Sequence, residues 1–164
     1  MLLSIERALF QSGDRRVNVD RLILTARVQA VRGALSSEAI LAGLAEGNYD
    51  SPGSMLLATG EIGVGEPCIQ AAETLKRNDV VGIIAPAFSW PFFRLCINIG
   101  LPPLTLWEAG EIRTGDRLRI DVNSRVVKSM SAGTRYPIRD LSDQYIEILA
   151  CGGIEGYVQA RLVE

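Results

Sequence analysis

The strongest constraint on the fold is a strand, a glycine turn, a helix and a second strand that follow one another between residues 54 and 104. An apolar run at 55–59 enters a turn containing Gly60, Gly63 and Gly65, a helix-like segment follows, and a second apolar run occupies 80–86. Such a unit directs backbone N–H groups of the turn and of the helix N-terminus toward one point, where a carboxylate or phosphate binds without a basic side chain. The sequence therefore predicts an anion site at this turn.

Composition predicts one domain over residues 1–164. The 164 residues are 48% hydrophobic and 22% charged, without an internal repeat or a linker, and this length is sufficient for one hydrophobic core. A formal net charge of −2 argues against binding to nucleic acid, which requires a concentrated basic face. The start of the chain lacks a signal-peptide pattern, and no apolar run reaches the roughly 18 to 20 residues of a membrane span. We therefore expect a cytoplasmic protein that does not bind membranes.

The cysteine and histidine content restricts the chemistry. The three cysteines, Cys68, Cys96 and Cys151, are odd in number and widely spaced, which disfavours a disulfide framework and fits a reducing compartment. The chain has no histidine, so a self-contained Ser-His-Asp or Cys-His enzyme is excluded. No closely spaced cysteine pair offers a closed zinc or iron–sulfur site. Any metal would have to come from another chain.

The pattern of polar and apolar residues predicts an α/β fold with a layered β/β/α architecture. Ser36 or Ser37 is expected to cap a short helix, and Pro67 to begin a helix that ends near Asn78. Gly100 is expected to end a helix that begins near Trp90. The other predicted elements are a strand at 17–27, a polar loop at 48–54, a hairpin with strands at 115–123 and 125–130, and helices at 141–150 and 154–163.

The segment after the second strand is more specific than the glycine turn. It runs Ala85-Pro86-Ala87-Phe88-Ser89-Trp90-Pro91-Phe92-Phe93-Arg94-Leu95-Cys96-Ile97-Asn98-Ile99-Gly100-Leu101-Pro102-Pro103-Leu104. Together with residues 60–72, this segment resembles the small subunit of 3-isopropylmalate dehydratase, the swivelling domain of the aconitase family. The resemblance extends more weakly to residues 18–27, similar to the family's Asn-x-Asp…Ile-Ile-Pro-Ala-Arg opening, and to residues 146–154, similar to its Ile-Leu-x-x-Gly-Gly helix end.

The resemblance implies a subunit of a hydro-lyase that is not active alone. In such enzymes a separate large subunit carries a [4Fe–4S] cluster, and the small subunit closes over a hydroxy-acid substrate. The expected partners are therefore that large subunit and a small hydroxy acid, with no cofactor in this chain. Leucine biosynthesis is the default pathway of the family.

The chain departs from the family at the turn that carries the chemistry. Relatives have Gly-Ser-Ser-Arg-Glu-His-Ala, where this chain has Gly65-Glu66-Pro67-Cys68-Ile69-Gln70-Ala71. The family's first serine acts as a base and its arginine clamps a carboxylate, but the matched residues here are Glu66 and Cys68, so neither role transfers. Losing the arginine removes a pair worth about 1.5–3 kcal/mol, and Glu66 adds a negative charge, so a dicarboxylate would bind poorly.

Two hypotheses for the turn follow. In the first, Glu66 is a general base and Arg94 or Arg27 supplies the positive charge. In the second, the site is vestigial or serves only to shape and cover a partner. The candidate residues are Glu66 and Cys68 for catalysis and Gly63, Gly65, Arg27 and Arg94 for substrate binding.

Two alternative functions come from other classes. One is a non-catalytic binding or regulatory module that keeps the swivel fold but has a degenerate active-site turn. The other is a stand-alone thiol enzyme built on Cys68. An aromatic cluster at Phe88, Trp90, Phe92 and Phe93 is expected to be core or a surface for another subunit.

Overall fold

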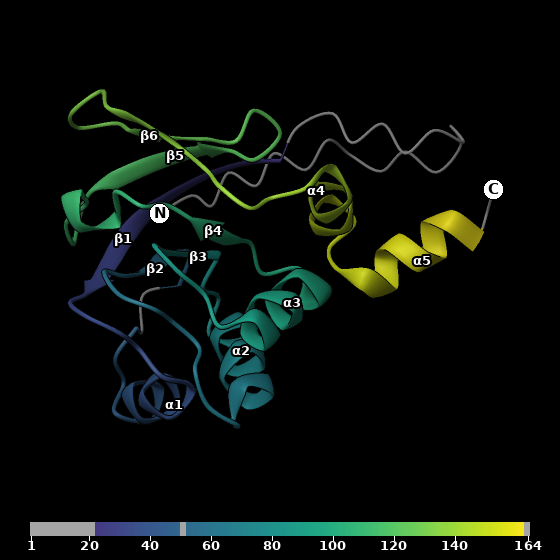
Figure 1. The fold of residues 1–164 in the computed structure, drawn as a ribbon, viewed down its shortest axis with the longest axis horizontal. Coiled ribbons are helices and arrows are strands. Elements are labelled where there is room, and N and C mark those ends of the chain that lie inside the picture. The colour runs from purple at the N-terminus through teal and green to yellow at the C-terminus, as the bar shows by residue number, and fades with distance from the viewer. Residues whose placement is uncertain (1–21, 50–51, 163–164) are drawn as a thin grey trace.

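A mixed sheet with strand order β4-β3-β2-β1-β5-β6-β7 organises the computed structural model, which describes residues 22–49 and 52–162 (Figure 1). The strands are β1 Ile23–Val31, β2 Met55–Ala58, β3 Gly82–Ala85, β4 Pro103–Thr105, β5 Arg117–Asp121, β6 Val126–Ser129 and β7 Arg135–Pro137. The helices are α1 Ser37–Ala45, α2 Cys68–Arg77, α3 Trp90–Ile99, α4 Asp143–Ala150 and α5 Ile154–Leu162, with a short 3-10 helix at Ala109–Glu111.

Strand β1 divides the sheet into two halves. It pairs in parallel with β2, and β2–β3 and β3–β4 are parallel as well, which makes the parallel half. On its other edge β1 pairs antiparallel with β5, followed by β6 and β7, which makes the antiparallel half. The amide of Arg139, just beyond β7, donates a 2.9 Å hydrogen bond to the carbonyl of Thr105 in β4. This contact joins the two outer strands, so the sheet curls back on itself.

The curled sheet and its helices enclose two cores. Leu57 and Ile84 face the antiparallel half, where they pack with Leu118 in the inter-sheet core. Their neighbours Leu56 and Ile83 face the opposite way and pack under α1, α2 and α3 in the helix-side core. Because both faces of β2 and β3 are covered, these strands are continuous apolar runs. Figure 1 shows the resulting order of antiparallel strands, parallel strands and helices. The layered β/β/α prediction is confirmed.

Local signals in the sequence set several boundaries as expected. The Ser36 hydroxyl accepts a 3.1 Å hydrogen bond from the amide of Ala39 and caps α1. Pro67 immediately precedes α2, and α3 ends at Gly100 in the left-handed conformation with φ 79°. The hairpin of β5 and β6 and the helices α4 and α5 also match the predicted order.

Other boundaries differ because they depend on long-range pairing. The strand expected to end at Arg27 continues to Val31, since its second half pairs with β2. The first part of that predicted strand, the family-like residues 18–21 and the N-terminal residues considered for a signal peptide lie outside the described residues. Strand β7 was not predicted from the sequence. No helix within residues 22–49 and 52–162 has both the length and the apolar character needed to cross a membrane.

Candidate functional site

The candidate site lies at the carboxyl edge of the parallel half. Beyond the strands, the loops pair again in parallel, with Ile62 bridging Leu35 on one side and Phe88 on the other. The helices α1, α2 and α3 all begin directly after these paired loops. Their N-termini therefore lie at the same edge of the sheet, the place where open α/β sheets bind ligands.

The glycine turn fits against α3 at Gly63. This residue has φ +91°, and a Cβ added to it would lie 2.2 Å from Cγ of Phe92. Phe92 is fully buried in the helix-side core, so it has little freedom to move away. At Gly65, with φ +114°, the nearest atom to an added Cβ would be 3.9 Å away. Gly63 is required by close packing and by its backbone conformation, and Gly65 by its backbone conformation alone.

Ser37 anchors the turn from the other side. Its buried hydroxyl donates a 2.8 Å hydrogen bond to the carbonyl of Gly63. Its amide donates a bond of the same length to the carbonyl of Val64. The amide of Gly63 donates to the carbonyl of Leu35 at 2.9 Å. The backbone of residues 63 and 64 is therefore fixed to the segment that enters α1.

The amides that follow residue 64 have no hydrogen-bond acceptor within residues 22–49 and 52–162. Helix α2 has no side-chain cap at Pro67, and the amides of Cys68, Ile69 and Gln70 donate to no group among the described residues. The same is true of the amides of Gly65 and Glu66. The N–H groups of a first helical turn all point out of the helix N-terminus, where the helix dipole favours an anion. The turn and α2 together thus leave a set of free amides beside residues that are firmly held.

The two side chains proposed for catalysis lie in different environments. Glu66 is exposed and makes no hydrogen bond or ion pair with any described residue. Cys68 is partly buried and packs against the helix-side core, close to Cys96. Burial raises the pKa of the Cys96 thiol, and the neighbouring Cys68 acts in the same direction. Of the two side chains, that of Glu66 is the more exposed to solvent.

The two candidate arginines are also far from equivalent. Arg94 is exposed one helical turn after Trp90 in α3, the helix that packs on the glycine turn through Phe92. Arg27 is exposed on β1 and lies directly opposite Arg117 of β5. Arg27 lies four residues before Val31, the last residue of β1, so it is about 13 Å along the strand from the edge that carries the turn. The structure places Arg94 on the exposed side of the helix that packs on the turn, and Arg27 on the antiparallel half.

A cleft of about 710 Å³ opens beside the loop that follows β3, and no residue of the glycine turn lines it. Its walls include Phe88, which bridges to Ile62 of the turn, and the aromatic residues Trp90 and Phe93 of α3. The rings of Trp90 and Phe93 stack with centroids 5.8 Å apart. The opposite wall comes from the β5–β6 turn and from the segment that enters α4. The predicted aromatic cluster therefore contributes both to the core and to the surface of a cleft.

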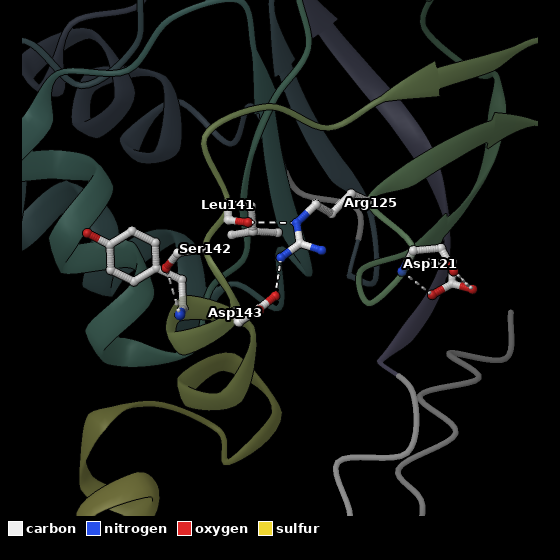
Figure 2. A network of polar contacts seen from close by, with 7 residues as sticks. Asp121, Arg125, Leu141, Ser142 and Asp143 are labelled. Carbon is white, nitrogen blue, oxygen red and sulfur yellow. Dashed lines mark hydrogen bonds and ion pairs between the residues drawn. The ribbon is translucent and has the colours of Figure 1, made fainter.

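Arg125 holds that opposite wall together (Figure 2). Its Nε donates a 2.8 Å hydrogen bond to the carbonyl of Leu141, and its Nη2 pairs with the carboxylate of Asp143 in the first turn of α4. Ser142 lies between these two partners and caps α4 by accepting from the amide of Tyr145 at 3.2 Å. One side chain thus ties the β5–β6 hairpin to the start of α4.

Comparison with known proteins identifies the family. The chain is 35% identical over 107 residues to 3-isopropylmalate dehydratase small subunit 1 of Thermotoga maritima, a match covering 65% of this chain and 64% of that protein. It is 34% identical over 110 residues to the small subunit of Pyrobaculum calidifontis, covering 66% of this chain and 68% of the relative. The chain belongs to the 3-isopropylmalate dehydratase small-subunit family.

A solved structure of a 3-isopropylmalate dehydratase has a similar fold. The crystal structure of 3-isopropylmalate dehydratase from Methanocaldococcus jannaschii matches with a TM-score of 0.78 and 23% identity, covering 87% of this chain and 96% of that one. No protein-family model matches the chain.

The site includes candidate residues that local sequence patterns do not reveal. The sequence indicates Ser36 or Ser37 as a helix cap, whereas in the structure Ser36 caps α1 and Ser37 holds the glycine turn. No local sequence pattern identifies Arg125, because its hydrogen-bond partners are 16 and 18 residues away in the chain. Within the described part of the chain, no group of three or more His, Cys, Asp or Glu side chains is arranged to hold a metal ion.

Proposed function

We propose that the chain is the small subunit of a hydro-lyase of the 3-isopropylmalate dehydratase type, active with a separate large subunit. The observation that carries the proposal is the set of free amides of Gly65, Glu66, Cys68, Ile69 and Gln70, beside a turn that is held in place on both sides. These amides would bind one carboxylate of a hydroxy acid. Leucine biosynthesis is the proposed pathway, and the cytoplasm the proposed location.

The large subunit is proposed to carry the [4Fe–4S] cluster, which supplies a Lewis acid that weakens the bond to the substrate hydroxyl. This chain would orient the acid through its amides and exclude water by closing over it. Large apolar side chains about half exposed to solvent surround the turn, namely Val64, Ile69 and Trp90. Such residues favour burial against a partner chain at this edge.

Glu66 is proposed to act as the general base of the turn, with Arg94 as the nearby cation. A base must reach the proton on the carbon next to the hydroxyl, and the exposed Glu66 carboxylate is free of competing partners among the described residues. Arg94 is an exposed cation on the helix that packs on the turn, and in the assembled enzyme it would offset part of the negative charge of Glu66 and substrate. Cys68, which packs toward Cys96, is proposed only to support the turn.

The proposal is tested by coexpressing the chain with the large subunit of the same organism and assaying dehydration of a panel of hydroxy acids. Turnover that requires both chains and the cluster is expected. Ile69→Pro then removes one free amide, at the position that Pro91 occupies in α3 of this protein, where the first helical turn accepts proline. KM is expected to rise at least tenfold, whereas Ile69→Ala, which keeps the amide, changes it little.

A second candidate is a non-catalytic module that binds the same large subunit. The replacement of the family's serine and arginine by Glu66 and the half-buried Cys68 favours it. A stable complex without turnover of any hydroxy acid would support this alternative. Full activity of Cys68→Ser would exclude a thiol enzyme, and a loss of kcat by a factor of 100 or more in Glu66→Gln, with a normal complex, would favour catalysis.

A further inference from the structure

The outer face of the antiparallel half is strongly basic. Along β1, β5, β6 and β7 every second side chain is buried in the inter-sheet core, and the residues between them face outward. Four of the outward-facing cations are exposed and Lys128 is partly buried. The cations of this basic face are Arg27, Arg117, Arg119, Lys128 and Arg135.

The strand register places these cations directly beside one another. Arg27 lies opposite Arg117, and Arg119 lies opposite Lys128, which in turn lies opposite Arg135. Directly opposed residues in antiparallel strands have Cβ atoms only about 5 Å apart, so like charges there repel and destabilise the sheet. This arrangement of like charges therefore does not stabilise the isolated chain.

No acidic side chain in the described part of the chain forms an ion pair with the basic face. Asp121 lies on the same face at the end of β5, where its carboxylate accepts hydrogen bonds from Ser124 and offsets one of the five positive charges. The positive field of the face is therefore available to a partner.

The composition of the face favours a protein partner over a polyanion. Four of the five cations are arginines, and Met130, which is 53% exposed, adjoins Arg117. Arginine and methionine are enriched at protein interfaces, whereas lysine is depleted. The whole chain carries a formal net charge of −2, so the surface outside this face is acidic in excess and would repel an extended nucleic acid.

We propose that the basic face contacts an acidic surface of the large subunit and steers its association with the small subunit. This inference rests on the proposed two-subunit function. Complementary charge accelerates diffusional encounter and sets the orientation of the partners, and its effect weakens with salt. The carboxyl edge of the parallel half is a separate surface, so this contact leaves the glycine turn and its free amides available to substrate.

The test is the association rate of the purified large subunit with Arg119→Glu/Lys128→Glu at 50 and 300 mM NaCl. We expect the rate to fall at least tenfold at 50 mM and to lose most of its salt dependence. The control, Arg77→Glu in the exposed last turn of α2, reverses a charge on the helical layer and is expected to change the rate less than twofold. Thermal melting verifies that both variants are folded.

The outcomes separate the two proposals. Wild-type association rates and salt dependence in the double variant would overturn the role of the basic face and leave the two-subunit function standing. Failure of the wild-type chain to bind the large subunit would overturn both. Tight binding of a single-stranded RNA oligonucleotide at 150 mM salt, lost in the double variant, would overturn the protein contact in favour of a polyanion.

Discussion

The hydroxyl of Ser37 donates a 2.8 Å hydrogen bond to the carbonyl of Gly63, across 26 residues of sequence. The bond joins the start of α1 to the turn that precedes α2. Because both groups are buried, it fixes the backbone that leads to the free amides of α2 and determines where a bound carboxylate would lie.

Ser37→Ala is expected to destabilise the fold by about 1–3 kcal/mol, because the buried Gly63 carbonyl loses its side-chain donor. It should also raise KM for the hydroxy acid in the assembled enzyme, since the turn is no longer held. Chemical denaturation and steady-state kinetics measure the two effects. Ser36→Ala is the matched control, with an expected cost of about 1 kcal/mol from the lost helix cap and an unchanged KM. Equal kinetic effects of both variants would contradict the anchoring role.

Gly63→Ala is expected to cost about 3 kcal/mol or more, because its Cβ would lie 2.2 Å from the buried Phe92 ring. Gly65→Ala would make only ordinary van der Waals contact, 3.9 Å from Cδ of Pro67, and should cost about 1–2 kcal/mol from backbone strain alone. The difference between the two midpoints of urea unfolding isolates the contact with Phe92. Similar midpoints for both variants would show that close packing does not constrain the turn.

Arg125→Ala is expected to destabilise the fold by about 1–2 kcal/mol, since the Leu141 carbonyl loses its donor. Asp143→Ala removes only the ion pair, whose carboxylate is 91% exposed, and should cost less than about 1 kcal/mol. Thermal and urea unfolding of both variants give the comparison. A larger loss in the aspartate variant would mean that the ion pair, rather than the bond to Leu141, joins the hairpin to α4.

Stability is expected to fall above pH 9. Burial raises the pKa of Cys96 well above its ordinary value of 9.0, so the folded protein keeps this proton while the unfolded chain releases it. The contribution of Cys96 is complete below pH 9 and is lost as the pH rises toward its folded pKa, by up to about 1.4 kcal/mol for each pH unit.

Urea unfolding between pH 8 and pH 10 measures this slope. Cys96→Ala should reduce it, whereas Ile97→Val, a truncation of the neighbouring buried residue without an ionisable group, should lower stability equally at every pH. An identical slope in wild type and Cys96→Ala would contradict the assignment.

The sequence by itself determined the elements whose signals are local. The cap at Ser36, the proline before α2 and the left-handed Gly100 depend on groups within a few residues of one another, so neighbouring residue types specify them. The β/β/α order followed from the run of apolar and alternating segments. The glycine turn and its helix were predicted for the same reason, and with them the position of the free amides.

Only the tertiary structure decided which distant residues meet. The length of β1, the pairing of β7, the role of Ser37 and the attachment of Arg125 all depend on contacts between separate segments. Strand register likewise placed Arg27 opposite Arg117 and away from the turn. Such contacts depend on how whole faces of the sheet pack, which no short stretch of residues encodes. The family turn could be located from the sequence, but the side chains that hold it and the charged face beyond it required the fold.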